Sequence, residues 1–364
     1  MFHGMRRSRP VMLTGGGTLG SVTPLLGVYE AWKKMDPEQA FVWIGTPGGP
    51  ETELVAEIGI PFDVILVPKA YRYLTWRWFA FPFFFLWSFF EAGFLLARYR
   101  PCWILSAGAY VSVPLAWLAP LFGARVALHQ LDYELGMSNR LMAPVASLVT
   151  STFSVTKKQL PRKRVEVVGA LVYGGHLKSS TREMAIEHFD LDAHKSTILV
   201  LGGGIGSLAL NRVFERWAEP LASEFNVLHA TGSGKRVFQS RRPPDHYYVT
   251  ELFVDDFGQA LHLADLVVTR AGLGTLIELV QGKKATIFVP LPNSPQEENA
   301  RAVAEAHAGI VLEQGRLETD LLKTIHEALE PHRKRRLEEA IGKLFPVDGA
   351  TRIVDLIKQK NTPE

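Results

Sequence analysis

Short apolar runs along the chain alternate with longer segments whose apolar residues recur at a helical spacing. The first run, Pro10–Leu13, ends in the turn sequence TGGGTLGS. A helix is predicted after this turn, with Thr23 as its N-cap and Pro24 at its first position. Strands that alternate with helices predict a mostly parallel sheet with right-handed crossovers. The further strands expected in this half are Phe41–Ile44, Val64–Val67, Cys102–Gly108, Ala124–Gln130, Leu148–Val155 and Val165–Val168.

The same pattern starts again after residues 173–196, a polar segment broken by Gly174 and Gly175 that is typical of a linker. A chain of 364 residues is long enough for about two domains. We therefore expect a first domain over 1–172, a second over 197–347, and a final helix over 348–360 that packs back on the first. The strands expected in the second half are Ser196–Leu201, Asn226–Ala230, Tyr247–Val249, Leu266–Thr269 and Ala285–Val289.

The composition excludes several classes of protein. With 47% hydrophobic and 21% charged residues, the chain is not a disordered one. Its formal net charge of +3 is small for a dedicated nucleic-acid binder, so no nucleic-acid partner is expected. Because Cys102 is the one cysteine, an internal disulfide and a multi-cysteine zinc site are both excluded.

Aromatic residues are concentrated in one segment: 13 of the 38 lie between Tyr71 and Phe94. The longest uncharged run there, Trp78–Phe90, has 13 residues, whereas a membrane-spanning helix needs about 20. Basic residues flank the segment, and aromatic side chains with a basic rim fit docking on an anionic membrane surface. We expect a helix that lies on the membrane, and a span or an ordinary buried helix stays as an alternative. The residues expected to dock are Trp76, Trp78, Phe79, Phe83, Phe84, Phe85 and Trp87.

Three glycine-rich turns follow predicted strands and precede predicted helices: Gly15–Ser21, Gly202–Ser207 and Ala271–Thr275. Such a turn can bring backbone N–H groups close to a phosphate or diphosphate. None of the turns ends in the Gly-Lys-Ser/Thr sequence of a P-loop. Glycine is also common wherever a strand turns tightly into a helix, so the repetition in two halves is the stronger signal.

The third turn allows two interpretations. Thr275 and Glu278 have the spacing of a capping box, which needs no ligand. Alternatively, the helix N-terminus receives a diphosphate and Glu278 accepts hydrogen bonds from two vicinal ribose hydroxyls. Arg270 belongs either to this site or to a structural ion pair. The spacing leaves these alternatives open.

Polar residues also follow a buried strand of the first half, where His129 and Asp132 stand beyond its carboxyl end. Polar groups at that end of an open α/β sheet face the ligand crevice, and these two could act as acid or base. An ordinary solvated loop is the alternative. The neighbouring carboxylates Asp255 and Asp256 are more typical of a turn than of a metal site.

Together these residues resemble the MurG-type family of GT-B glycosyltransferases. The motifs that carry the resemblance are GGTLGSVTP at 16–24, Gly108–Ser112 with Pro114, His129 to Asn139-Arg140, GGGIGS at 202–207, VTELFVDDF at 249–257, RAGLGTLIE at 270–278 and LPNSPQEENA at 291–300. The resemblance covers nearly the whole length. It implies an α/β, GT-B fold, in which two Rossmann-like domains with parallel sheets face a cleft.

The resemblance also implies roles for residues that match the family's motifs. Leu273, Gly274 and Thr275 would receive the diphosphate, Glu278 the ribose, and Val254 the uracil through its backbone. Gln296 would contact the sugar hydroxyls, and an N-domain loop of Gly17, Thr18 and Leu19 would lie near the diphosphate and the acceptor. The other residues expected at the substrates are Asp132, Tyr173, Gly204, Arg270, Leu276 and Ile277.

The chain departs from the family pattern mainly on the acceptor side. Ser21 stands where the family has a histidine often proposed as base, and Gln130 stands where it has glutamate. Asp132 replaces an asparagine, Tyr173 an arginine and Gly204 a serine. We take Asp132 as the first candidate for the general base and His129 as the second, with Ser21 at the remaining catalytic position.

The activity implied is an inverting transfer of N-acetylglucosamine from UDP-GlcNAc to the lipid-linked muramoyl-pentapeptide of peptidoglycan synthesis. The expected partners are the UDP-sugar, an undecaprenyl-linked lipid acceptor and an anionic membrane surface, with the protein peripheral on the cytoplasmic face. No cofactor and no metal are expected. The alternatives are a transferase for another lipid, such as diacylglycerol or a polyprenyl phosphate, a catalytically weak UDP-sugar-binding protein, and a UDP-GlcNAc epimerase of the same fold.

Overall fold

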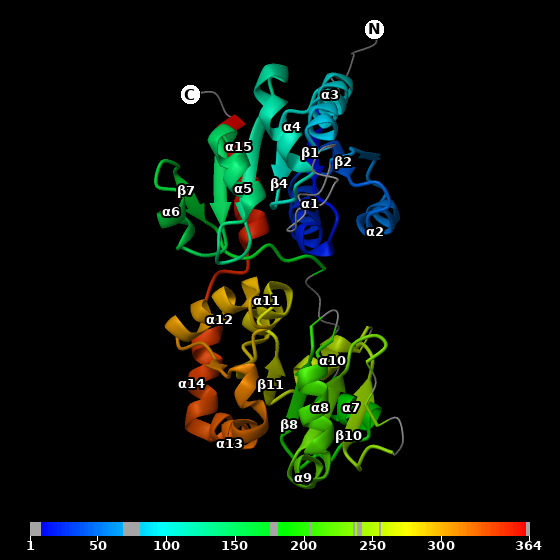
Figure 1. Cartoon of the computed structure of the whole chain (residues 1–364), viewed down its shortest axis with the longest axis vertical. Helices are drawn as coiled ribbons and strands as arrows, with labels where there is room; N and C mark the ends of the chain where they lie inside the picture. The colour runs from blue at the N-terminus through cyan, green and yellow to red at the C-terminus, as the bar shows by residue number, and fades with distance from the viewer. Residues whose placement is uncertain are drawn as a thin grey trace. The chain divides into compact units, whose positions relative to one another are not determined.

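The computed structural model describes residues 9–67, 81–174, 181–203, 206–235, 237–238, 242–254 and 256–361, without the side chains of residues 81–85. The chain forms two compact units (Figure 1). Unit 1 comprises Met1–Gly174 and Pro346–Glu364, and unit 2 comprises Gly175–Phe345.

Unit 1 is built on a seven-stranded sheet in the order β3-β2-β1-β4-β5-β6-β7. All of its strand pairs are parallel, which confirms the predicted type of sheet. Parallel sheets are covered on both faces, and the five inner strands are accordingly buried along most of their length, whereas the edge strands are partly exposed. The strands are β1 (Val11–Thr14), β2 (Phe41–Gly45), β3 (Phe62–Val64), β4 (Trp103–Ser106), β5 (Arg125–Gln130), β6 (Leu148–Ser151) and β7 (Val165–Val167).

The helices of unit 1 include one that returns from the far end of the chain. The last helix, α15 (Gly349–Asn361, red in Figure 1), packs against α1, and Trp103 Nε1 donates to Asn361 Oδ1 at 2.8 Å. The other helices are η1 (Leu19–Ser21), α1 (Thr23–Met35), α2 (Glu51–Ile58), α3 (Phe81–Tyr99), α4 (Ser112–Leu118), η3 (Ala119–Phe122), α5 (Met137–Met142), η4 (Ala143–Val145) and α6 (Thr156–Gln159).

Unit 2 repeats the arrangement with a parallel sheet in the order β10-β9-β8-β11-β12-β13. Its strands are β8 (Thr197–Leu201), β9 (Asn226–Ala230), β10 (Tyr247–Thr250), β11 (Leu266–Thr269), β12 (Thr286–Phe288) and β13 (Ile310–Val311). Its helices are α7 (Arg182–Phe189), α8 (Leu208–Arg216), α9 (Ala218–Glu224), α10 (Phe257–Leu263), α11 (Leu273–Gly282), α12 (Pro295–Glu305), η5 (Gln314–Arg316), α13 (Leu317–Leu329) and α14 (Pro331–Ile341).

The structure differs from the sequence-based expectation in several local features. Residues 182–189 form α7 rather than linker, because Thr181 caps the helix by accepting from Met184 N and Phe189 is buried. The strand expected at Val64–Val67 is β3, Phe62–Val64. Thr23 is not the N-cap of α1, since the turn η1 leads into the helix and Thr23 Oγ1 donates back to Leu19 O. The two-residue strand β13 was not expected.

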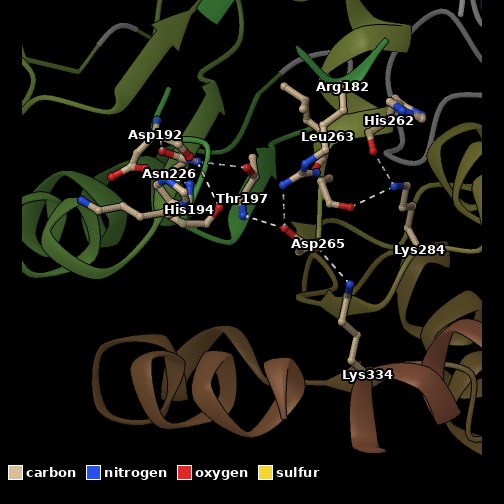
Figure 2. A network of polar contacts seen from close by, with 12 residues as sticks. Arg182, Asp192, His194, Thr197, Asn226, His262, Leu263, Asp265, Lys284 and Lys334 are labelled. Atoms are coloured by element: carbon tan, nitrogen blue, oxygen red, sulfur yellow. Dashed lines mark hydrogen bonds and ion pairs between the residues drawn. The ribbon is translucent and has the colours of Figure 1, made fainter. Parts of the chain in front are cut away.

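A charged network lies at the amino end of the central strands of unit 2 (Figure 2). Asp265, which directly precedes β11, accepts from Thr197 N at 2.9 Å and pairs with Lys334 Nζ at 2.9 Å. Arg182 of α7 lies 4.0 Å from the same carboxylate. Because ligands of open α/β sheets bind at the carboxyl ends of the strands, this network belongs to the stability of the unit.

Candidate functional site

The clearest candidate binding element of unit 2 is the N-terminus of α11, which follows the carboxyl end of β11. The helix starts at Leu273 after Gly272, which has extended backbone and makes no side-chain cap. Thr275 is therefore the third residue of the helix, and the capping-box interpretation is wrong. A Cβ atom on Gly272 or Gly274 would meet nothing within 4 Å. The first N–H groups of a helix have no partner within it, so this open end suits an anion.

Glu278 lies on the next turn of α11 from Thr275 and is half-buried. Burial raises the pKa of this carboxyl to about 7. Residues three apart on a helix share a face, so a ligand at the α11 N-terminus would reach Thr275 and Glu278 together. Perturbed carboxylates are concentrated at functional sites, which fits the predicted role at a diol.

Arg270 joins three separate segments at the carboxyl end of the same sheet. Its guanidinium donates to Val289 O at 2.9 Å and Pro290 O at 3.2 Å, and to Ser207 Oγ and Gln314 Oε1 at 2.7 Å each. These acceptors are neutral, and burial lowers the pKa of Arg270. Among the described residues, Arg270 therefore does not form the structural ion pair that was the alternative.

The glycine turn after β8 packs tightly against the loop after β9. A Cβ atom on Gly206 would lie 2.2 Å from Thr231 O, so this glycine is required by backbone packing. Behind it, Asn211 donates to Thr231 O and Lys235 O at 3.0 Å each. Ser207 caps α8 by accepting from Leu210 N. Gly204, predicted at the substrate, lies outside the described residues.

The remaining predicted residues of unit 2 fall into two groups. Val254 is 76% exposed after β10, and Gln296 is half-buried near the start of α12, where its Oε1 accepts from Leu291 N. Leu276 and Ile277, in contrast, are buried in the core at 0% and 8% exposure. Their side chains therefore face away from a ligand at the helix end, which corrects their assignment as substrate-binding residues.

In unit 1, the glycine turn after β1 presents an exposed tip of Thr18, Leu19 and Gly20. Gly17 has a φ of +78°, a left-handed conformation that favours glycine, and its N–H donates to Glu51 Oε2 at 3.2 Å. Ser21 Oγ donates to Thr18 O at 3.4 Å within the turn. This contact holds the turn together and supplies no partner that would make Ser21 a base.

His129 lies inside the sheet rather than beyond it. It is 2% exposed, and its two ring nitrogens contact Thr150 Oγ1 at 2.9 Å and Thr152 Oγ1 at 3.2 Å. Burial lowers its pKa to about 3. A histidine so enclosed has no access to an acceptor hydroxyl, so the assignment of His129 as a candidate base is corrected to a structural role.

Asp132 lies half-buried in the loop after β5, where Gln130 braces the backbone. Gln130 Nε2 donates to Asp132 O at 2.8 Å and Glu134 O at 2.7 Å, while its Oε1 accepts from Asn139 Nδ2. The residue that departs from the family's glutamate thus has a clear positioning role. Tyr173 is also half-buried, and its pKa is raised by burial and by Glu30 and Glu57.

The aromatic segment is described in part. Trp76, Trp78 and Phe79 lie outside the described residues, as do the side chains of Phe83, Phe84 and Phe85. On the described part of α3, apolar side chains at helical spacing face solvent: Leu86 (68% exposed), Trp87 (55%), Phe90 (70%) and Phe94 (63%). The elements α4 and η3 pack against α3, and α5 packs against α4. These elements also carry exposed apolar side chains: Trp117, Leu121, Met137 and Leu141.

No helix in the described ranges is long and apolar enough to cross a membrane. Within the same ranges, no group of three or more His, Cys, Asp or Glu side chains is arranged to hold a metal ion.

Two parallel sheets with glycine turns and an open helix N-terminus at the carboxyl ends of their strands define a protein of the GT-B class. Solved structures agree with this class. A structure of Acinetobacter baumannii MurG matches at 25% identity and a TM-score of 0.75, and the match covers 96% of this chain and 99% of that chain. Two further structures share the fold. The calicheamicin glycosyltransferase CalG4 has 13% identity and a TM-score of 0.71, with 98% of this chain and 100% of that chain covered. A putative UDP-N-acetylglucosamine 2-epimerase from Listeria monocytogenes has 15% identity and a TM-score of 0.66, with 98% of each chain covered.

Family models match both halves: the glycosyltransferase family 28 N-terminal domain over residues 11–151 and its C-terminal domain over 197–353. A protein of Geobacillus kaustophilus is 30% identical to this chain, in an alignment that covers 88% of this chain and 91% of that protein. A protein of Clostridium perfringens is 28% identical, and its alignment covers 96% of this chain and 98% of that protein. Both are named UDP-N-acetylglucosamine--N-acetylmuramyl-(pentapeptide) pyrophosphoryl-undecaprenol N-acetylglucosamine transferase. The chain belongs to glycosyltransferase family 28, and it is therefore a glycosyltransferase.

Proposed function

We propose that this protein transfers N-acetylglucosamine from UDP-GlcNAc to the lipid-linked muramoyl-pentapeptide, converting lipid I to lipid II. The observation that carries the proposal is the open N-terminus of α11 with Glu278 one turn along it. It is supported by relatives of that name that align over nearly the whole chain. UDP-GlcNAc is the donor substrate, and no further cofactor takes part.

The donor's diphosphate binds at the N–H groups of Leu273, Gly274 and Thr275, and the ribose hydroxyls donate to Glu278. The Val254 backbone contacts the uracil, and Gln296 contacts the sugar hydroxyls. Tyr173 and Gly204 complete the substrate contacts. Arg270 supports this site electrostatically, since its buried charge is met by neutral acceptors in the free protein.

Chemistry proceeds by a single displacement with inversion. The acceptor hydroxyl attacks the anomeric carbon, Asp132 takes the hydroxyl proton, and the bond between the anomeric carbon and the diphosphate oxygen breaks. The helix N-terminus stabilises the negative charge that develops on the leaving UDP, an electrostatic contribution that needs no reorganisation during the reaction.

A transfer assay tests the donor and acceptor. Purified protein with labelled UDP-GlcNAc and a short-chain lipid I analogue is run beside UDP-glucose with diacylglycerol. Label on the lipid I analogue alone is expected. Label on diacylglycerol alone would support the second candidate, a transferase for another membrane lipid, which the altered acceptor-side residues Ser21 and Gln130 favour. UDP binding without any transfer would indicate a catalytically inactive sugar-nucleotide binder.

Asp132→Asn tests the base, with Glu134→Gln as the matched control because Glu134 is an exposed carboxylate in the same loop. Loss of a general base should lower kcat by about 10²–10⁴-fold with UDP affinity intact. An Asp132→Asn enzyme as active as Glu134→Gln would remove Asp132 from the mechanism.

The apolar side chains on α3 and the elements packed beside it dock the protein peripherally on the cytoplasmic face of the membrane, next to the undecaprenyl-linked acceptor. Exposed apolar patches of this kind mark interaction surfaces. Replacing Trp87, Phe90 and Leu121 with serine should abolish sedimentation with anionic vesicles and leave transfer to a water-soluble acceptor analogue unchanged. Equal sedimentation of variant and parent would contradict the docking.

A further inference from the structure

Glu51 is a buried carboxylate directly beneath the glycine turn of unit 1. It is 0% exposed and is the first residue of α2. Its Oε1 accepts from Thr46 N at 2.7 Å and Thr46 Oγ1 at 2.6 Å, and its Oε2 accepts from Gly17 N at 3.2 Å. Within the described part of the chain no Lys or Arg pairs with it, so amide and hydroxyl donors and the helix N-terminus provide its stabilisation.

Two glycines lie against this carboxylate, and their lack of a side chain makes room for it. A Cβ atom on Gly16 would lie 2.2 Å from Glu51 Oε1, and one on Gly49 would lie 2.2 Å from Oε2. Real Cβ atoms essentially never make contacts this short. Part of the glycine-rich sequence of unit 1 is thus explained by an internal carboxylate rather than by a ligand.

The hydrogen bond from Gly17 also determines which atoms of the turn are available. Because the Gly17 N–H already donates to an anion, it is not a donor for a phosphate group. The carboxylate instead holds the left-handed Gly17 in place, and the exposed residues Thr18, Leu19 and Gly20 follow directly. Charge-assisted hydrogen bonds to a backbone N–H are among the stronger ones, and they suit a rigid anchor.

We propose that Glu51 is a positioning residue for the transfer reaction, which holds the turn Gly15–Ser21 so that its exposed tip meets the acceptor. This inference rests on the proposed function. It assigns the turn of unit 1 to the acceptor, and it leaves binding of the donor diphosphate to unit 2. A reacting group must be held close to its productive geometry, and small displacements of a positioning element lower kcat.

Glu51→Gln is the decisive variant, because the amide keeps the size of the carboxylate but offers one oxygen where three donors converge. At least one of Gly17 N and Thr46 N then loses its acceptor. We expect kcat to fall at least tenfold, with the KM for UDP-GlcNAc and the affinity for UDP within twofold of the parent. Glu53→Gln, the same change at an exposed position of α2, should leave all three unchanged.

A second variant and a second measurement distinguish loss of the anchor from misfolding of Glu51→Gln. Thr46→Val removes one donor from Glu51 with little change of shape, and a smaller loss of kcat in the same direction is expected. Hydrogen–deuterium exchange of the peptide that contains Gly17 should be faster in Glu51→Gln than in Glu53→Gln. Unchanged kcat in a folded Glu51→Gln protein, or a parallel loss of UDP affinity, would overturn the proposal.

The exchange measurement also separates this inference from the proposed function. If the parent protein transfers no sugar to lipid I, the proposed function fails. The exchange of the Gly17 peptide then still decides whether Glu51 anchors the turn: faster exchange in Glu51→Gln supports the anchor, and unchanged exchange overturns it.

Discussion

The first strand of each sheet ends in a glycine turn, but the two turns are held by groups of opposite charge. In unit 1 the turn Gly15–Ser21 rests on the buried carboxylate of Glu51. In unit 2 the turn Gly202–Ser207 ends at Ser207, which accepts from the buried guanidinium of Arg270. The corresponding strands share the same central order in both sheets, so the topology does not explain the difference.

The comparison shows that glycine-rich turns of similar sequence can have different chemistry. A buried cation beside an open helix N-terminus favours an anionic ligand, whereas a buried anion that occupies the turn's own N–H group disfavours one. This contrast supports the proposal that the diphosphate binds in unit 2 and that the turn of unit 1 meets a part of the acceptor that carries no phosphate. The following variants test that contrast.

The largest effect is expected from Arg270→Met. It leaves four acceptors without this donor, of which Val289 O and Ser207 Oγ are buried. It should lower the free energy of unfolding by about 2–4 kcal/mol and UDP affinity by more than about tenfold. Arg216→Met is the control, because Arg216 is 64% exposed in a surface pair with Glu318 and should change stability by less than about 1 kcal/mol. Urea unfolding and calorimetric titration with UDP give both quantities. Unchanged UDP affinity would remove the electrostatic role of Arg270.

Glu278→Gln should have a pH-dependent effect on stability. Burial raises the pKa of Glu278 to about 7 from an ordinary 4.5, so the unfolded chain loses this proton at lower pH than the folded one. The folded protein therefore loses stability as pH rises from about 4.5 to 7, by about 1–3 kcal/mol in all. The variant should be more stable than the parent at pH 8 and equal to it near pH 4.5. An equal difference in the free energy of unfolding between variant and parent at both pH values would contradict the raised pKa of Glu278.

Asp265→Asn tests whether the amino end of the sheet matters for binding. Loss of the carboxylate that joins Thr197, Lys334 and Arg182 (Figure 2) should lower the free energy of unfolding by about 1–2 kcal/mol, since the pairs are partly exposed. UDP affinity should not change, in contrast with Arg270→Met. The surface change Glu318→Gln serves as the control. A loss of UDP affinity in Asp265→Asn would show that the two ends of the sheet are coupled.

The smallest expected effect is the pH dependence of UDP binding. If the ionised Glu278 accepts from the ribose hydroxyls, UDP affinity should rise by up to about tenfold between pH 6 and pH 8, as the carboxyl with its pKa near 7 loses its proton. Glu278→Gln should bind more weakly than the parent at pH 8 and show little dependence on pH. Titrations across that range would reject a role at the ribose if both proteins followed the same curve.

Much of the architecture could be predicted from the sequence because it depends on local patterns. Continuous apolar runs identified the parallel strands, and the strands at Asn226–Ala230 and Leu266–Thr269 match those residues. The α11 N-terminus could be located because glycine, a short turn and a helical period occur within a few residues. The prediction of Thr23 as an N-cap was wrong, because η1 leads into α1 and Thr23 is already the first residue of the helix. Of the two interpretations left open at Thr275, the capping box is excluded because Thr275 lies within α11.

The sequence by itself thus determined two halves with glycine turns, membership of a family of glycosyltransferases and the position of the α11 N-terminus. Only the tertiary structure decided what the polar residues around these elements do. The burial of His129 and Glu51 became known only from their positions in the folded structure. The hydrogen-bond partner of Gly17 lies 34 residues away along the chain. Hydrogen-bond partners and desolvation depend on distances in space, so no local pattern could show that one glycine turn encloses an anion while the other is braced by a cation.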